Sequence, residues 1–338
     1  MFSNLKWGYI QTALAVCITV SLPLQASKNV ISNTSVLPMS PYEIMISKSF
    51  KYKEYVALKD IDAYTISLRT RISKSYGLYV DYESSDISFK GFNLHNQKMK
   101  LINKISLYRK KKFHITTDLI FERNQADDIA ITDNWTLNKI LKEIAPDKNI
   151  KIVDDEIIFG SSTVNIYDKN GNFIQPKVNI SNLYSNSFGL KTYFGYGITY
   201  DSYLDVYLSI VKNNIYGDVS FEPQSDMIKS DGSLNSISRD ELVLASGFTY
   251  FKRFDDLKLE FNYEYNKFYR DIVNKYNVNQ TADLVFNYSL TERLNLFFQV
   301  KYMTHQLMNY IPYSYNKLTA YSFSRHYGFF KTGLIYEF

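Results

Sequence analysis

The chain has 338 residues and a net charge of +5, with 39 Lys and Arg against 34 Asp and Glu. The two signs nearly balance, and the sequence lacks the basic stripe that nucleic-acid binding requires, so no nucleic-acid partner is expected. The length suffices for one large barrel or two ordinary domains. The excess of aromatics, 30 Tyr and 23 Phe, suits the two aromatic girdles where a β-barrel meets lipid headgroups. A Tyr-rich secreted sandwich is the alternative.

Residues 1 to 26 have the composition of a secretory signal peptide. Lys6 precedes an uncharged apolar stretch from Trp7 to Leu24, and the small Ala26 suits cleavage before Ser27. The apolar stretch is shorter than the roughly 20 residues of a membrane-spanning helix, so an uncleaved anchor is the minor alternative. After the leader no apolar segment approaches that length, and a mature chain that spans a bilayer must do so with strands.

Cys17 is the single cysteine of the chain. It follows Leu14, Ala15 and Val16, a weak likeness to a lipoprotein acylation site, but Val16 is bulkier than that site usually accepts. Cleavage after Ala26 removes this thiol. The exported chain then crosses an oxidising compartment with no cysteine to mispair.

After a short periplasmic segment over 27 to 41, residues 42 to 338 show the period-two alternation of strands with one apolar face. The clearest case is 257 to 267, where Leu, Phe and Tyr alternate with Lys, Glu and Asn. Counting this pattern along the chain predicts about twelve strands. They lie near 42–53, 61–72, 76–86, 100–109, 113–123, 186–198, 203–219, 241–254, 257–267, 282–290, 294–302 and 325–338.

The connections between these strands alternate in length. Thr291-Glu292-Arg293 and Phe254-Asp255-Asp256 are tight hairpin turns, whereas 268 to 279 and 306 to 320 are long. Short turns on one rim and long loops on the other are typical of transmembrane barrels, with the short turns in the periplasm. The predicted fold is therefore all-β, a transmembrane antiparallel up-and-down β-barrel with both termini on the periplasmic side.

The charged face of these strands must point into the barrel, because a Lys or Arg against lipid at the bilayer midplane costs roughly 2 to 4 kcal/mol. Two interpretations of this face remain open. The charges either pair across a narrow interior and keep it polar, or they line a water-filled path and tune its selectivity. The predicted lumen-facing residues are Arg69, Arg71, Asp81, Glu83, His114, Asp118, Lys191, Asp205, Lys258, Glu260, Glu264, Asp283 and Lys301.

The segment 124 to 185 interrupts the strand rhythm and is too long for an ordinary connection. Asp133 can cap a helix whose apolar stripe runs from Trp135 to Ile144 and stops before Pro146. Asn170-Gly171 predicts a hairpin turn further on. We expect this extracellular insertion, a small helix plus hairpin, to occlude part of the barrel mouth as a plug or lid, with an outward binding surface as the alternative.

The sequence offers little catalytic chemistry. It contains no G-x-S-x-G elbow, H-E-x-x-H or C-x-x-C motif and no phosphate-binding Gly loop, and its four His have no metal-ligand spacing. No metal, cofactor or catalytic residue is predicted. Outer-membrane phospholipases use a His-Ser-Asn arrangement in a barrel of similar strand number, so a lipid hydrolase is the less favoured alternative. Ser324 and His326 have suitable residue types without the motif.

The last eight residues alternate and end on an aromatic residue, with Lys331, Gly333, Tyr336 and Phe338 at characteristic places. This pattern resembles the C-terminal assembly signal of Gram-negative outer-membrane β-barrels. With about twelve strands and no secreted domain upstream, the chain looks most like a solitary autotransporter-type barrel without a passenger. The resemblance implies insertion by the barrel-assembly machinery.

These observations predict a monomeric integral protein of the Gram-negative outer membrane, surrounded by lipid and lipopolysaccharide. The predicted function is a narrow or gated pore for small solutes. The alternative is a structural or surface-interaction barrel that presents the insertion.

Overall fold

The computed structural model describes residues 42–51, 58–89, 92–134, 137–138, 150–154, 156–159, 162–164, 167, 170–222, 237–270, 277–304 and 327–338. The predicted signal peptide and the segment 27 to 41 lie outside them, as do His305, Ser324 and His326. Within the described residues, no helix is long and apolar enough to cross a membrane.

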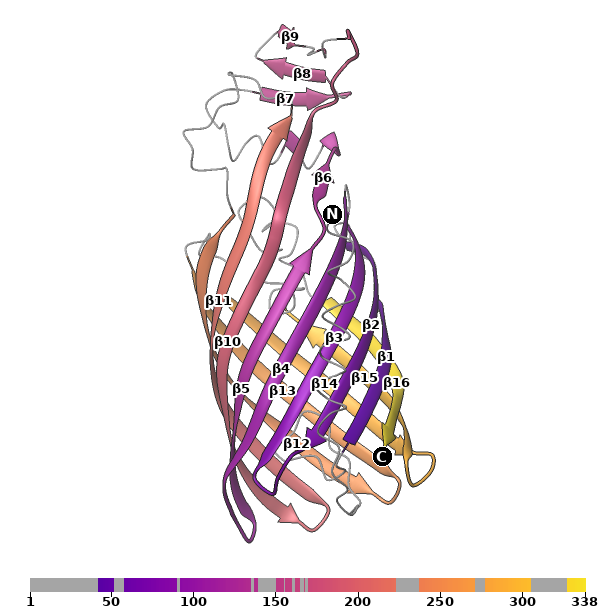
Figure 1. Ribbon diagram of the computed structural model, residues 1–338, viewed down its shortest axis with the longest axis vertical. Coiled ribbons are helices and arrows are strands. Elements are labelled where there is room, and N and C mark those ends of the chain that lie inside the picture. The colour runs from indigo at the N-terminus through magenta and orange to yellow at the C-terminus, as the bar shows by residue number, and fades with distance from the viewer. Residues whose placement is uncertain are drawn as a thin grey trace.

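Twelve antiparallel strands in the described part of the chain form one closed barrel (Figure 1). The last strand pairs with the first, and β5 pairs with β10, so the ring of strands has no gap. The barrel strands are β1 (Tyr42–Lys51), β2 (Leu58–Arg71), β3 (Tyr76–Phe89), β4 (Phe92–Lys110), β5 (Phe113–Ala126), β10 (Lys177–Thr199), β11 (Ser202–Glu222), β12 (Arg239–Phe254), β13 (Leu257–Tyr269), β14 (Val278–Ser289), β15 (Leu294–Met303) and β16 (Tyr327–Glu337).

The predicted all-β barrel is confirmed, since each predicted strand segment coincides with one barrel strand. The largest shifts are at two strands that start well before their predicted ranges: β4 at Phe92 and β10 at Lys177. At the added end of β4, polar side chains lie on the outward face, where His95 Nδ1 is 2.6 Å from Asp86 Oδ1 on β3. A strand that extends beyond an apolar band needs no apolar outward face, so the outward alternation of apolar residues ends there.

The two ends of the barrel differ in their connections. At one end, two-residue turns join β4 to β5, β10 to β11 and β12 to β13, and the chain terminus after β16 lies at the same end (Figure 1). Lys111 and Asp255 have φ angles of 51° and 41° in these turns, the left-handed conformation of tight hairpins. The longer connections, from β5 to β10 and from β11 to β12, lie at the other end.

The outward face of the barrel is apolar and the inward face polar. On β11, the outward Leu208 is 61% exposed, whereas the inward Asp205 is fully buried. Outward residues of neighbouring strands continue this surface, and Phe298 stacks on Phe330 with ring centroids 5.7 Å apart. Apolar patches of this extent on a protein surface mark contact with another apolar phase. This outer face is the one that lipid would cover in a transmembrane barrel.

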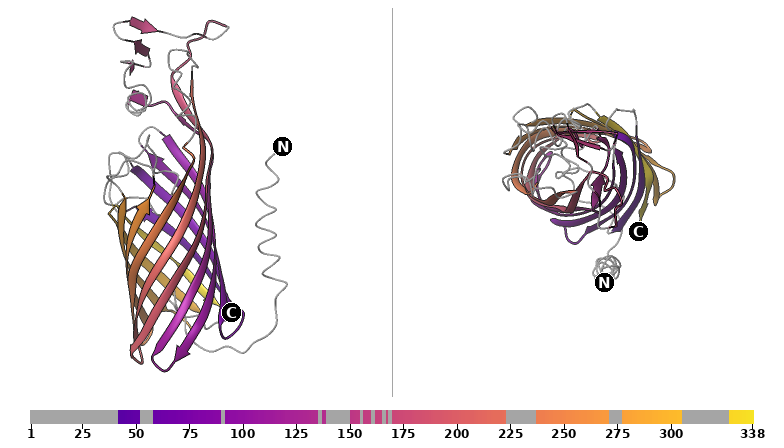
Figure 2. Two further views of the ribbon diagram at one scale, coloured as in Figure 1. Left: turned by 90° about the vertical axis from the view of Figure 1, so that its left-hand side faces the viewer. Right: turned by 90° about the horizontal axis from the view of Figure 1, so that it is seen from above.

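The segment between β5 and β10 forms structure beyond the barrel. β6 (Ile129–Ile131) pairs with β10, whose outer end also pairs with β11 as far as Lys177 and Glu222, and these three strands form the outer ribbon (Figure 2). Its inner side is buried, with Ile131, Val178 and Ile180 almost inaccessible. At its far end lies the cap sheet of β7 (Ile150–Val153), β8 (Glu156–Phe159) and β9 (Ser162–Val164) (Figure 1).

The structure does not support the predicted helix of the insertion as an element, because most of its residues lie outside the described ones. Its first turn is described, with the Leu137 amide donating to the Asp133 carbonyl at 2.9 Å. Asn138 then hydrogen-bonds both backbone groups of Ile152 on β7 at 2.6 and 2.7 Å. In the predicted hairpin, Tyr167 forms an antiparallel β-bridge with Phe173. Gly171, in the turn between them, has a φ of +80°.

Replacing Leu208 by Arg places a guanidinium on the outward face, and we expect a loss of roughly 2–4 kcal/mol in unfolding free energy. Urea unfolding of the leaderless protein in lipid vesicles measures this cost. Tyr200→Arg, at a fully exposed position in the β10–β11 turn, is the matched control and should cost about 0–1 kcal/mol. Wild-type stability of Leu208→Arg would contradict lipid contact on this face.

Candidate functional site

The inner wall of the barrel carries rows of charged side chains joined to one another. Strand register places each predicted lumen-facing residue on the inward side, and Arg69, Glu83, Asp118, Asp205, Lys258, Glu260 and Asp283 are buried there. Arg71 lies apart from the rows at the end of β2, where its Nε donates to the Ser73 carbonyl oxygen at 3.2 Å. Whether the other residues line a solute path stays a prediction.

A buried ion pair joins β4 to β5 at the middle of the wall. Lys104 Nζ lies 2.8 Å from Asp118 Oδ1, and each side chain is only 4% exposed. The Tyr193 hydroxyl of β10 donates to Asp118 Oδ2 at 3.2 Å, and Lys104 Nζ is 4.7 Å from the Tyr193 ring centroid. Because an unpaired charge buried to this degree costs several kcal/mol, the three groups stabilise one another as a unit.

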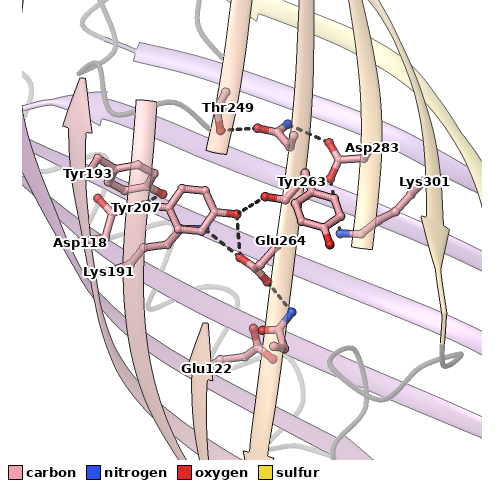
Figure 3. A network of polar contacts seen from close by, with 12 residues as sticks. Asp118, Glu122, Lys191, Tyr193, Tyr207, Thr249, Tyr263, Glu264, Asp283 and Lys301 are labelled. Carbon is pink, nitrogen blue, oxygen red and sulfur yellow. Dashed lines mark hydrogen bonds and ion pairs between the residues drawn. The ribbon is translucent and has the colours of Figure 1, made fainter. Parts of the chain in front are cut away.

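A second group lies beside the first (Figure 3). Lys191 Nζ of β10 is 3.1 Å from Glu264 Oε2 of β13, and the Tyr207 hydroxyl of β11 donates to the same oxygen at 3.1 Å. Lys191 Nζ also lies 3.6 Å from the Tyr207 ring centroid, a cation–π contact. Asn266 donates to the other oxygen of Glu264 at 3.0 Å. Both oxygens of this carboxylate are thus satisfied.

Gly247 of β12 makes room for this group. The Tyr207 ring lies over it, and a Cβ at position 247 would be 2.4 Å from the Tyr207 hydroxyl oxygen and 2.2 Å from the Tyr263 carbonyl oxygen. Only glycine allows the tyrosine to pass over β12 and reach β13. Gly195 has the same role for His114, whose Nε2 is 3.1 Å from Asp205 Oδ1.

A third group connects β12 to β15. The Thr249 hydroxyl donates to Asn262 Oδ1 at 2.5 Å, and Asn262 Nδ2 donates to Asp283 at 2.8 Å (Figure 3). Asn262 Nδ2 also donates to Glu260 at 2.7 Å. Lys301 Nζ lies 3.9 Å from Asp283 Oδ2. The amide of Asn262 thus holds the carboxylate of Glu260 on its own strand and that of Asp283 on β14 in place.

Two further groups lie on the described part of the wall. On β4 and β5, Glu122 contacts Lys98 at 3.3 Å and Lys100 at 3.9 Å. Near the insertion end, Glu241 Oε1 accepts from both Arg239 at 2.7 Å and Arg270 at 3.2 Å. Cations and anions are therefore paired over the described inner surface, and pairing, rather than an excess of one sign, characterises the wall.

Sequence reasoning missed several members of these groups. Lys98, Lys100 and Lys104 share the inward phase of β4 and could have been found by extending its alternation. Tyr193 and Tyr207 point inward although the prediction assigned aromatic residues to the lipid face. The sequence did contain the information needed to place them. Tyr193 lies two residues after Lys191, and Tyr207 two residues after Asp205, and residues two apart share a strand face.

The predicted assembly residues lie on β16 and just after it. Lys331 and Gly333 occupy the inward register opposite Ser49 and Ser47 of β1. Tyr336 and Phe338 are exposed, and their ring centroids are 4.8 Å apart in an edge-to-face contact. Recognition of this end by an assembly machinery stays a prediction. Over the described ranges, no group of three or more His, Cys, Asp or Glu side chains is arranged to hold a metal ion.

Asp118→Asn leaves Lys104 buried without a counter-charge, and we expect about 3–5 kcal/mol of lost stability. Urea unfolding in lipid vesicles measures it. The matched control is Asp240→Asn, which breaks the outward pair with Lys212, whose side chains are 55% and 64% exposed, and should cost about 0–1 kcal/mol. Equal effects of the two substitutions would contradict the tight burial of the inner pair.

No protein-family model and no curated protein matches this sequence. Among solved structures, the chain is similar to the translocator domain of autotransporter NalP from Neisseria meningitidis, with a TM-score of 0.53, 11% identity, and coverage of 99% of this chain and 98% of that chain. The β domain of the Bordetella autotransporter BrkA aligns with a TM-score of 0.45 and 9% identity, over 88% of this chain and 99% of that one. The KdgM porin aligns with a TM-score of 0.41 and 10% identity, over the same shares.

At such low identity the similarity to the NalP domain concerns the fold alone. It agrees with the strand pairing above: this chain is a closed antiparallel β-barrel.

Proposed function

We propose that this protein is an integral outer-membrane barrel of a Gram-negative bacterium whose lumen is a narrow path for small hydrophilic solutes. The observation that carries the proposal is the contrast between the two faces of one closed wall. The outside is apolar and exposed, while the inside holds paired charges that no soluble core of this size would enclose in rows.

The number of strands supports a narrow path. Eight strands enclose a space that side chains fill, whereas barrels of about 16 to 18 strands leave a wide aqueous channel. Twelve strands lie between these limits, and long Lys, Glu and Tyr side chains project from the wall into the enclosed space. Polar side chains in such a space favour water and hydrophilic solutes over apolar ones.

The orientation follows from the same rules. The end with short turns and the C-terminus faces the periplasm, and the outer ribbon and cap sheet face the exterior. Removal of the leader between Ala26 and Ser27, recognition of the Lys331 to Phe338 segment by the barrel-assembly machinery, and a monomeric state in contact with lipopolysaccharide belong to this proposal.

A surface-interaction role is the second candidate, and one observation favours it. The outer ribbon has a small buried core of its own, formed by Ile131, Val178 and Ile180, and supports the cap sheet beyond the barrel (Figure 2). A ligand-binding insertion requires such a rigid base. The two roles are compatible, since one concerns the lumen and the other the exterior.

Planar-bilayer recordings test the pore role. We expect the purified wild-type barrel to give steady unit openings. Deletion of residues 132 to 176, with Ile131 joined to Lys177 by a short Gly-Ser turn, should leave their conductance unchanged. The join is feasible because Ile131 pairs with Val178, and the described cap strands lie beyond the barrel end.

Larger openings after the deletion would mean that the insertion covers the mouth, which is the occlusion expected from the sequence. Silence of both forms, with barrels that remain folded in detergent and vesicles, would contradict the pore and leave the surface role.

A further inference from the structure

The Lys191–Glu264 pair does not join neighbouring strands. Lys191 lies on β10 and Glu264 on β13, with β11 and β12 between them in the wall. Three strand spacings correspond to about 14 Å along the sheet. Two side chains can meet at 3.1 Å over that arc only by leaving the wall and crossing on its inner side. This pair, hereafter the Lys191–Glu264 bridge, therefore crosses part of the barrel interior instead of following the wall.

Tyr207 contacts both residues of the bridge and holds them in place. Its ring passes over Gly247, and its hydroxyl donates to Glu264 and lies 3.3 Å from the Tyr263 carbonyl oxygen (Figure 3). The ring also lies under Lys191 Nζ. Both ends of the bridge thus rest on the same tyrosine, which fixes their position in the interior.

The bridge is part of a belt at one level of the barrel. Register aligns Lys104 with Asp118 and Asp118 with Lys191, and the next row aligns Tyr193 with Tyr207 and Tyr207 with Gly247. The Tyr193 and Tyr207 rings lie 5.4 Å apart. The belt consequently covers the inner wall from β4 to β13 without a break.

Solvent reaches the two parts of the belt unequally. Lys104 and Asp118 are each 4% exposed, whereas Lys191 and Glu264 are 18% and 25% exposed. The bridge is thus the part of the belt that borders the remaining free space. Groups at this border meet any passing solute first.

We propose that Lys191 and Glu264, held in place by the buried Tyr207, form the constriction of the lumen and set its selectivity. This inference rests on the proposed pore function and names the part that controls it. Because the cation and the anion of the bridge cancel, the wild-type constriction favours small uncharged hydrophilic solutes and discriminates little between simple ions. Loss of either charge leaves the other unbalanced at the narrowest point.

Reversal potentials in a KCl gradient across a planar bilayer test the proposal. Glu264→Gln leaves Lys191 unbalanced and should shift selectivity toward chloride, while Lys191→Met should shift it toward potassium. Tyr207→Phe keeps the ring but removes the hydroxyl that holds Glu264, and should raise unit conductance without a large selectivity shift. Lys212→Met and Asp240→Asn break an outward pair between adjacent strands and should leave both quantities at wild-type values.

The outcomes separate the constriction from the pore itself. Openings in every variant, with unchanged reversal potentials for Glu264→Gln and Lys191→Met, would overturn the constriction and leave the pore. A silent wild type with conducting bridge variants would overturn the open constriction, because the bridge would then close the lumen. Silence of all variants, shown to be folded by their heat-dependent migration in gels, would overturn both.

Discussion

The rest of the structure depends on the closure of the backbone hydrogen-bond ladder. Hydrocarbon offers no partner for an exposed N–H or C=O group, so a sheet survives in a bilayer only when its edges meet. Here the terminal β16 pairs with β1 from Glu43 to Lys51, and β10 pairs with both β5 and β11 across the site of the long insertion. The insertion leaves the ring intact because β5 and β10, the strands on either side of it in the chain, pair directly with each other in the barrel.

Closure also determines what the side chains can do. Alternation forces every second side chain into the enclosed space, and the charged ones find partners there rather than water alone. Glycines at Gly195 and Gly247 let His114 and Tyr207 extend over a neighbouring strand. Interactions therefore reach beyond adjacent strands, and the Lys191–Glu264 bridge spans a quarter of the twelve-strand ring. The interior gains rigidity and a defined narrow point from the same contacts.

Much of the fold could be predicted because an apolar outer face and a polar inner face impose period two on each strand. That constraint located the strands and the inward phase of residues such as Asp118 and Glu264. It located the outer ends of β4 and β10 less well: in β10 the alternation from Lys177 to Ser181 buries Val178 and Ile180, and a bulge between Ser181 and Tyr184 separates it from the phase in the barrel. It also could not identify partners: Lys191 meets Glu264 through curvature and the space above Gly247, which local sequence does not encode. Tyr207 was missed because an amphipathic ring suits either face.

Lipid contact with the outward side chains is the claim on which both the pore and its constriction depend. Leu208→Trp, in a chain whose Trp135 is replaced by Phe, tests it directly in vesicles of lipids brominated on their acyl chains. A blue-shifted Trp emission that the bromines quench strongly is the expected result. Emission typical of water, without quenching, from a protein that remains folded would contradict the membrane barrel.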